Sequence, residues 1–311
     1  MKTVLITGSA GFLGSHLCDK MLSCGFKVIG IDNLCSGNER NISHLNADKN
    51  FTFIKEDVIS FDTGEKIDYI LNFACPASPV AYQRDPLFTS DTCYLGARNM
   101  LEMAKRNNAV ILQASTSEVY GDPDVSPQNE NYCGNVNPHG IRSCYDEGKR
   151  IAESLMFDYA RLFGVKIKVA RIFNTYGPRM DKNDGRVVSN FIVQALQNKP
   201  ITVYGRGEQT RSFCYVDDLV DGITKLLLSK DDIIGPINIG TDFEFSISWL
   251  ANTVTELIKT SSEIEYKSLP SDDPQKRRPD LTLAKQTLGY MPKVSVLDGL
   301  AKTIEYFRQI V

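Results

Sequence analysis

Residues 3–14 read Thr3-Val4-Leu5-Ile6-Thr7-Gly8-Ser9-Ala10-Gly11-Phe12-Leu13-Gly14. The first five are apolar or β-branched, which predicts a short buried strand, and residues 15–22 predict a helix. A glycine turn between strand and helix is the context of a dinucleotide-binding motif, here with the spacing Gly-x-x-Gly-x-x-Gly. Such glycines let backbone N–H groups approach a pyrophosphate, and the start of the helix favours its negative charge. We therefore expect a dinucleotide to be bound by Gly8, Gly11, Phe12, Leu13 and Gly14.

Asp32 ends a second predicted strand, residues 27–32, about twenty residues beyond the glycine turn. A carboxylate at this point can accept hydrogen bonds from the adenosine ribose and would repel a 2′-phosphate, which favours NAD over NADP. The alternative is that Asp32 is an ordinary turn aspartate that binds no ribose. We expect the adenosine to lie also against residues that follow the second and third strands, namely Asn33, Ser36, Gly37, Asp57 and Val58.

Strands and helices alternate through the first half of the chain. Further strands are predicted at residues 51–54, 67–74, 109–114 and 165–173, and a helix at residues 91–107. This pattern is typical of an α/β protein with a doubly wound parallel Rossmann sheet. We expect residues 1–175 to form an NAD-binding Rossmann domain. Residues 176–311 are expected to form mainly a smaller C-terminal substrate-binding lobe, with residues 236–240 returning to the main sheet.

Tyr145 and Lys149 stand four residues apart in a predicted helix, so their side chains project from one face. A nearby ammonium stabilises a phenolate, and lowering a tyrosine pKa by ~3 units needs roughly 4 kcal/mol. The spacing alone recurs by chance on many helices. Thr116, Ser117 and Glu118 directly follow the fifth strand, at the same sheet edge as the glycine turn, and become candidate substrate-hydroxyl and proton-transfer groups.

The same helix continues through Ile151, Leu155, Tyr159 and Leu162, at a spacing that predicts a buried face. Beyond the sixth strand, the alternation of strands and helices breaks down. Short strands are predicted there at residues 201–204 and 211–216. We take that region as part of the smaller lobe.

Composition excludes several classes of function. The chain has 311 residues and a net charge of −3, which argues against a nucleic-acid partner. No apolar run approaches the ~18 residues of a membrane helix, and we expect no leader peptide. Eight cysteines form no Cys-x-x-Cys pair, and with three histidines no metal-site spacing is present. Reduced thiols in a cytoplasmic protein are expected.

Three motifs follow the glycine turn in order: Thr116-Ser117-Glu118-Val119-Tyr120-Gly121, Tyr145-x-x-x-Lys149 and Arg171-x-Phe-Asn-x-Tyr-Gly-Pro178. With them the chain resembles, over nearly its whole length, extended short-chain dehydrogenases/reductases that act on nucleotide sugars. Longer motifs at residues 74–79, 134–138, 142–149, 185–191 and 272–280 closely resemble the UDP-glucuronate decarboxylase family, also called UDP-xylose synthases.

The resemblance implies an NAD-dependent carboxy-lyase that makes UDP-xylose. NAD⁺ takes a hydride from C4 of the sugar while Tyr145 takes the C4 hydroxyl proton, and Thr116 hydrogen-bonds the C4 oxygen. Lys149 lowers the tyrosine pKa and holds the nicotinamide ribose. The 4-ketone lies β to the C6 carboxylate, so the electrons left by CO₂ enter an enolate. Glu118, with Ser117 and Arg277, orients the carboxylate and manages proton delivery to C5, and NADH then returns its hydride.

Further roles are carried over from the matched positions. The resemblance implies that Thr175 and Arg186 lie near NAD and that Arg211 contacts the diphosphate. Without the resemblance, the alternative for Arg211 is an ordinary solvated surface arginine. The alternative for Arg277 is a basic surface run with Lys276 and Arg278. The substrate is implied to contact Asn174, Val188, Ser189, Asn190, Phe191, Ile192, Tyr204 and Gly205, the last two at the uridine.

Two positions depart from the family pattern. Cys93 replaces a usual asparagine that steadies the site, and Phe88 replaces a common lysine expected near the substrate. The exact nucleotide sugar therefore stays open at this stage. The family implies a homodimer joined through the helices that contain Cys93 and Tyr145.

Three alternative functions fit parts of the same sequence. A dTDP-glucose 4,6-dehydratase shares the first oxidation, but usually has an aspartic acid where this chain has Ser117. A 4-epimerase would need the keto sugar to turn over in the site. A non-catalytic NAD-binding scaffold need not retain Thr116, Tyr145 and Lys149 together.

Overall fold

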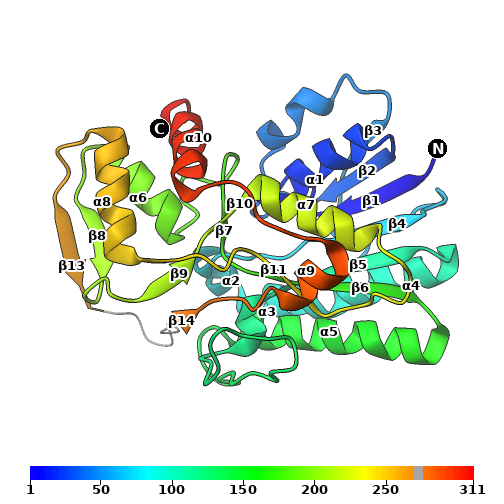
Figure 1. Ribbon diagram of the computed structural model, residues 1–311. Helices are drawn as coiled ribbons and strands as arrows, with labels where there is room; N and C mark the ends of the chain where they lie inside the picture. Colours follow the sequence, from blue (N-terminus) through cyan, green and yellow to red (C-terminus); the bar gives the residue numbers. More distant parts are fainter. Residues whose placement is uncertain (269–275) are drawn as a thin grey trace.

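The computed structural model describes residues 1–268 and 276–311 (Figure 1). Its main element is a seven-stranded sheet in the order β11-β6-β5-β4-β1-β2-β3, with every neighbouring pair parallel. The order steps outward in both directions from β1, which confirms the predicted doubly wound Rossmann sheet. The strands are β1 (Thr3–Thr7), β2 (Lys27–Asp32), β3 (Phe51–Lys55), β4 (Tyr69–Asn72), β5 (Val110–Thr116), β6 (Lys166–Ile172) and β11 (Ile237–Ile239).

Helices cover both faces of this sheet (Figure 1). On one face lie α1 (Phe12–Ser23) and α7 (Val216–Leu227), and on the other lie α4 (Ala97–Asn107) and α5 (Ser143–Phe163). Each face has its own hydrophobic cluster because parallel strands are apolar on both sides. β11 completes the edge beside β6, so the predicted return of residues 236–240 to the main sheet is confirmed.

The buried stripe of α5 differs from our prediction. Tyr159 is buried, but Ile151 is 42% exposed and Leu162 is 73% exposed. Ala152 and Met156 are buried in their place. The apolar residues of α5 therefore occupy two stripes, and the sequence spacing selected residues from both.

A helical segment that begins at Pro86 precedes the predicted start of the helix at residue 91. It consists of α3 (Pro86–Asp91), a π-helical stretch η3 (Thr92–Gly96) and then α4. A further short helix, α2 (Pro79–Arg84), was not predicted. Both α2 and α3 start with proline at the first turn, where its missing N–H costs nothing.

A smaller lobe that includes α6, β8, α8 and β13 lies beside the sheet, at the left of Figure 1. The predicted strand at residues 211–216 is wrong in detail, because it divides into two strands of different sheets and Val216 opens α7. Besides α7 and β11, the described elements that follow β6 are β7 (Thr175–Tyr176), α6 (Val187–Leu196), β8 (Ile201–Tyr204), β9 (Thr210–Ser212), β10 (Cys214–Tyr215), β12 (Glu244–Ser246), α8 (Ile247–Ile258), β13 (Ile264–Lys267), β14 (Lys276–Arg277), α9 (Thr282–Leu288) and α10 (Val296–Arg308).

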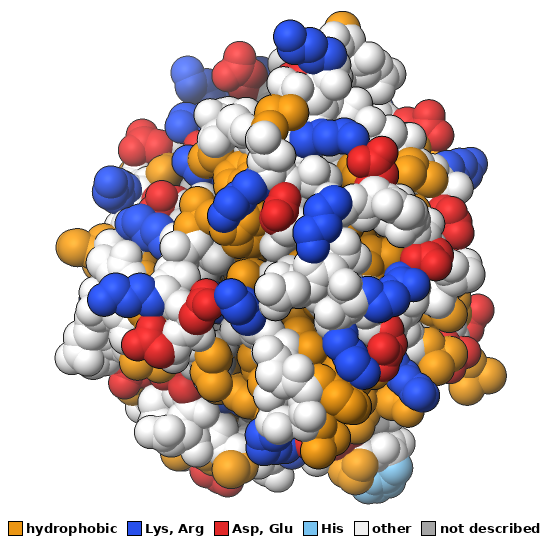
Figure 2. Space-filling model, turned by 90° about the vertical axis from the view of Figure 1, so that its right-hand side faces the viewer, with side chains coloured by type: hydrophobic (Ala, Val, Ile, Leu, Met, Phe, Trp, Pro, Cys, Tyr) orange, Lys and Arg blue, Asp and Glu red, His pale blue; other side chains and the backbone are white. Residues whose placement is uncertain are grey.

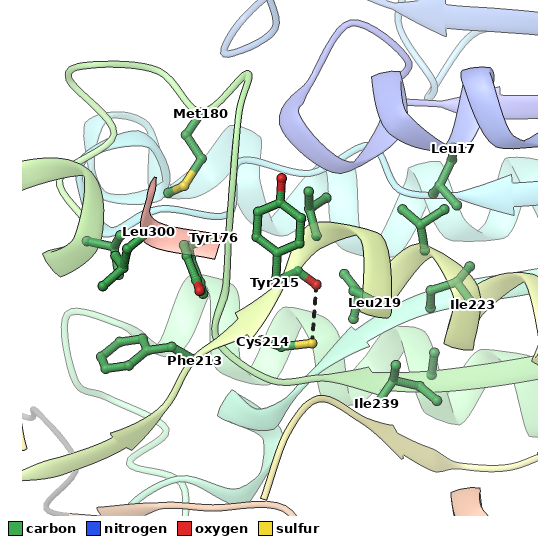
Figure 3. Packing of buried hydrophobic residues seen from close by; sticks show 14 of the residues in the cluster. Leu17, Tyr176, Met180, Phe213, Cys214, Tyr215, Leu219, Ile223, Ile239 and Leu300 are labelled. Carbon is green, nitrogen blue, oxygen red and sulfur yellow. Dashed lines mark hydrogen bonds between the residues drawn. The ribbon is translucent and has the colours of Figure 1, made fainter. Parts of the chain in front are cut away.

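One hydrophobic cluster joins this lobe to the sheet. It runs from Leu17 in α1 through Tyr215 and Leu219 to Leu250 in α8 and Leu300 in α10. Figure 3 shows its central part, where side chains from several of these elements meet. The two parts of the chain therefore share one core.

Among the described residues, no helix combines the length and apolar character needed to cross a membrane. On the face drawn in Figure 2, Lys and Arg side chains are interspersed with Asp and Glu.

Candidate active site

A cavity of about 630 Å³ opens at the carboxyl ends of the parallel strands and extends to the smaller lobe. Its wall brings together 24 of the residues expected to bind cofactor or substrate: Gly8, Gly11, Phe12, Leu13, Gly14, Asp32, Asn33, Ser36, Asp57, Val58, Thr116, Ser117, Glu118, Tyr145, Lys149, Asn174, Thr175, Arg186, Val188, Asn190, Phe191, Tyr204, Arg211 and Arg277.

Four expected residues do not line this cavity in the described part of the chain. Ser189 and Ile192 are fully buried, because on α6 they face the core rather than the cavity. Gly205 lies beyond the end of β8, next to Tyr204. Gly37 lies against the carboxylate of Asp32, where an added Cβ would come within 2.8 Å of an oxygen.

The glycine turn holds the start of α1 close to β1. Gly8 has a φ of +68°, and the N–H of Gly11 donates to its carbonyl over 3.1 Å. A Cβ on Gly14 would lie 2.0 Å from the Gly8 oxygen, so only glycine allows this approach of turn and helix. The arrangement leaves room for a pyrophosphate at the helix start, and the residues present fit a dinucleotide.

The carboxylate of Asp32 is fixed at the end of β2. It accepts hydrogen bonds from the backbone N–H of Ala10 over 3.0 Å and of Leu34 over 2.8 Å. Asn33 donates to Asp57 over 2.7 Å, which joins the ends of β2 and β3. An acceptor held at this edge suits a ribose hydroxyl.

Tyr145 and Lys149 project from the first turns of α5 into the cavity. The Lys149 Nζ lies 5.6 Å from the centre of the Tyr145 ring and donates to the Ala114 carbonyl over 3.0 Å. Tyr82 of α2 stacks on the Tyr145 ring with centres 5.1 Å apart, a partner that sequence reasoning missed. The missed α2 is the reason, since it carries Tyr82.

The pKa of Tyr145 lies well above its ordinary value, first because of burial and then because of negative charge at Cys75, Cys93 and Glu118. A hydrogen bond with Thr116 acts in the opposite direction. The expected lowering of this pKa by Lys149 is therefore not seen among the protein groups alone.

Glu118 lies in a cluster of arginines. Its carboxylate accepts hydrogen bonds from Arg142 and, over 3.1 Å, from Arg277, which also donates to the Ser117 carbonyl over 2.8 Å. Burial alone would raise the pKa of Glu118, but the charges of Arg277, Arg142 and Arg211 outweigh it and hold that pKa below its ordinary value. Glu118 is thus an anion between cations.

Arg277 is 2% exposed, which removes the alternative that it belongs to a solvated basic run. It is paired in register with Arg211 through the parallel strands β14 and β9, and Arg211 is buried as well. Arg142 was part of a resemblance motif but was not predicted as a site residue. Residues 272–275 of the last motif lie outside the described residues.

Arg186 is held at the start of α6 by Asp184, at 2.5 Å and 2.7 Å between nitrogen and carboxylate oxygens. Its guanidinium also faces the Phe12 ring of the glycine turn at 5.9 Å. The lobe thereby reaches the dinucleotide side of the cavity. Within residues 1–268 and 276–311, no group of three or more His, Cys, Asp or Glu could hold a metal ion.

A doubly wound sheet with a glycine-turn cradle and a Tyr–Lys pair in the adjoining cavity defines a dinucleotide-dependent enzyme of the Rossmann class. Residues 4–240 match the NAD dependent epimerase/dehydratase family, and the chain belongs to that family. Its cofactor is NAD.

Proteins with similar sequences include UDP-glucuronic acid decarboxylase 6 of Arabidopsis thaliana, which is 52% identical over 306 residues, or 98% of this chain and 88% of that protein. UDP-glucuronic acid decarboxylase 1 of Xenopus tropicalis is 50% identical over 308 residues, or 99% of this chain and 72% of that protein. Among solved structures, UDP-glucuronic acid 4-epimerase of Bacillus cereus, in complex with UDP-glucuronic acid and NAD, is similar with a TM-score of 0.90. It is 30% identical, and the match covers 99% of this chain and 100% of that one.

Proposed function

We propose that this protein decarboxylates UDP-glucuronate to UDP-xylose through a 4-keto sugar. The observation that carries the proposal is the position of Glu118, an anion between Arg142 and Arg277 beside Thr116 in the Tyr145 cavity. Relatives that are named UDP-glucuronic acid decarboxylases and share 50–52% sequence identity with this chain support the same reaction.

Tyr145 acts as the base at the sugar C4 hydroxyl, and Thr116 holds the same oxygen by a hydrogen bond. When bound, NAD⁺ supplies a hydride acceptor and the positive charge of its nicotinamide ring. Lys149 adds its ammonium charge on the same side, which favours the phenolate form of Tyr145. Glycine-turn residues and Asp32 hold the pyrophosphate and ribose.

Arg277 and Ser117 position the C6 carboxylate of the 4-keto sugar. Loss of CO₂ leaves an enolate, because the new ketone is β to the carboxylate. C5 of the sugar then gains a proton, and Glu118 directs this step by orienting the proton donor. Its pKa is held low by arginines, so Glu118 acts mainly by orienting a proton donor rather than as the donor itself.

We place the NAD site chiefly in residues 1–175 and the nucleotide-sugar site chiefly in residues 176–311, with Arg211 at the diphosphate and Tyr204 at the uridine. β7 spans the proposed boundary, and the shared core joins the two parts. The proposed substrate-binding residues Ser189 and Ile192 would act only through the helix they anchor.

A 4-epimerase is the second candidate, because the similar Bacillus cereus protein is an epimerase crystallised with UDP-glucuronic acid. Both reactions start with oxidation at C4, so the first step does not distinguish them. The fate of C6 does, since only decarboxylation releases CO₂.

The test is a product assay. Purified protein is incubated with UDP-glucuronate, and the UDP-sugars and CO₂ are followed by NMR and mass spectrometry. UDP-xylose with equimolar CO₂ is expected. UDP-galacturonate without CO₂ would establish the epimerase, and turnover of dTDP-glucose to a 4-keto-6-deoxy sugar would establish the dehydratase.

The variant Glu118→Gln tests the role of Glu118 in decarboxylation. We expect a loss of CO₂ release of roughly 10²-fold or more, because the arginine cluster loses its counter-charge and C5 protonation loses its organising group. Glu65→Gln, an exposed glutamate paired with Lys27, is the matched control and should retain activity. Equal activity of the two variants would remove Glu118 from the mechanism.

We further propose a homodimer and a cytoplasmic location. Apolar side chains are exposed side by side on α3, η3 and α5: Leu87 is 77% exposed, and Tyr94 and Ile151 are about two-fifths exposed. Such a grouped patch supports an interface. Eight free thiols support a reducing compartment.

A further inference from the structure

Two thiols meet at the wall of the active-site cavity. The Sγ atoms of Cys75 and Cys93 are 3.3 Å apart, within hydrogen-bonding contact of each other. Cys75 lies in the loop after β4 and lines the cavity, whereas Cys93 lies behind it in η3 and is 4% exposed. A small molecule in the cavity therefore reaches Cys75 first.

The protein groups around the pair make the two sulfurs unequal. A hydrogen bond from Cys93 lowers the pKa of Cys75 despite burial, and the charge of Lys149 acts in the same direction. The pKa of Cys93 is raised, first by its hydrogen bond to Cys75 and then by burial. Thiolates are the reactive form of cysteine, so Cys75 is the nucleophile and Cys93 the resolving thiol.

Gly148 of α5 brings the pair next to the catalytic residues. A Cβ at Gly148 would lie 3.0 Å from both Cβ and Sγ of Cys93, so α5 packs directly on this cysteine. Lys149 is the next residue in the chain. Any displacement of Cys93 is therefore transmitted to the helix that carries Tyr145 and Lys149.

We propose that Cys75 and Cys93 form a reversible disulfide when hydrogen peroxide enters the cavity, and that this cross-link slows turnover. The Cys75 thiolate attacks the peroxide and breaks its O–O bond, giving a sulfenic acid and one water after protonation. Cys93 then attacks that sulfur and releases a second water. The two thiols lose two electrons and two protons, and the peroxide is reduced.

The required movement is small. A disulfide has an S–S length near 2.05 Å, so the sulfurs must approach by about 1.2 Å. The π-helical turn around Cys93 is a local irregularity in the helix rather than a regular α-turn, and such turns are frequent at functional sites. Closing the bond draws the Cys75 loop away from the cavity and removes the thiol beside Lys149.

The Cys75–Cys93 pair lies at the cavity wall but takes no part in the proposed reaction. The chemistry at C4 does not need it. The cross-link therefore regulates the site without being a step of the reaction.

The test begins with peptide mapping, which does not depend on the substrate. The purified holoenzyme is treated with hydrogen peroxide, blocked with a thiol reagent and digested with trypsin without reduction. Cleavage after Lys66, Arg84 and Arg98 separates the two cysteines, into peptides 67–84 and 85–98. We expect a linked species equal in mass to the two peptides less two hydrogen atoms, which disappears on reduction.

Activity is measured on the same samples with UDP-glucuronate. We expect a loss of roughly tenfold after peroxide and recovery with dithiothreitol, because disulfide formation is reversible and further sulfur oxidation is not. Cys93→Ala should show neither the linked peptides nor the recoverable loss, relative to its own untreated activity. Cys24→Ala, an exposed cysteine after α1, is the matched control and should behave as the parent protein.

Absence of the linked peptides after peroxide would overturn the proposal, as would an equal recoverable loss in Cys93→Ala. If the protein proves to have another activity on nucleotide sugars, the peptide result still decides whether the disulfide forms. The activity arm is then repeated with that substrate.

Discussion

Tyr145 needs help to act as a base, because burial and nearby negative groups hold its pKa above the ordinary value. Lys149 provides positive charge near the ring of Tyr145, and a bound oxidised cofactor would add to it. We expect Tyr145→Phe to lower kcat by roughly 10³-fold with little change in KM, since the hydroxyl acts on the proton rather than on substrate affinity. Steady-state CO₂ release measures this effect.

Tyr306→Phe is the matched control for that variant, because Tyr306 lies in α10 and its hydroxyl accepts a hydrogen bond from the exposed Arg40 over 3.3 Å. Its kcat should stay within about twofold of the parent value. A Tyr145→Phe enzyme with near-normal kcat would assign the base to another group.

Asp146 follows Tyr145 in α5 and is itself buried, with one carboxylate oxygen that lacks a hydrogen-bond partner among the described residues. Burial first, and then the charge of Glu118, raise the pKa of Asp146 to about 7. A carboxyl whose folded pKa is raised favours folding at low pH, and this stability is lost as pH rises through the folded value.

Asp146→Asn should therefore change the pH dependence of stability. Between pH 6 and pH 8 the variant is expected to gain about 1.4 kcal/mol relative to the parent, because only the parent must ionise a buried carboxyl. Thermal unfolding at both pH values measures the difference. Parallel curves for the two proteins would mean that Asp146 is ionised throughout this range.

At the scale of elements, a buried ion pair joins α5 to the sheet. Arg171 of β6 forms two hydrogen bonds with Glu153 of α5, at 3.0 Å and 2.8 Å, and Ser115 at the end of β5 donates to the same carboxylate. The pair fixes the helix that carries Tyr145 relative to the strand that precedes Thr116.

Glu153→Ala should lower the free energy of unfolding by about 3–5 kcal/mol, because it leaves the Arg171 charge buried without its partner. Urea unfolding followed by circular dichroism measures the change. Asp158→Ala breaks an exposed pair with Arg161 on the same helix and is expected to cost less than about 1 kcal/mol. Similar losses in both variants would show that burial of the pair adds nothing.

Most of the strands could be predicted from the sequence, because parallel strands buried on both faces read as short continuous apolar runs. The start of α7 could not, since Phe213-Cys214-Tyr215-Val216 is a β-type sequence that packing divides between a two-residue strand and a helix. The π-turn at Cys93 is likewise set by packing of η3 on α5, and no local sequence pattern marks it.

The site could be predicted residue by residue where a motif marks it, as at Gly8–Gly14 and Tyr145–Lys149. The contacts between motifs could not, because they depend on the tertiary fold. Arg277 meets Glu118 across 159 positions in the chain, and the stack of Tyr82 on Tyr145 comes from a helix that was not predicted.

For the whole molecule, the exposed apolar patch on α3, η3 and α5 leads to a prediction about assembly. Ile151→Asp should convert the proposed dimer to a monomer, because a charge at the centre of an apolar interface is left without a partner. Light scattering coupled to size-exclusion chromatography measures the mass.

Phe243→Asp alters a more exposed apolar side chain in another part of the surface, at 66% against 42% for Ile151, and should leave the mass unchanged. A parent protein that is monomeric at micromolar concentration would rule out this interface as a stable one. Loss of the dimer in both variants would point to a general loss of folding instead.

The arrival of Arg277 late in the chain has a consequence for synthesis. A growing chain that has reached Gly240 already contains every strand of the main sheet, including β11. Glu118 then has Arg142 nearby, but Arg277 still has to be translated, some forty residues later. The glycine turn and Asp32 are thereby synthesised long before the arginine that completes the cluster around Glu118, so this cluster is the last part of the expected site to be made.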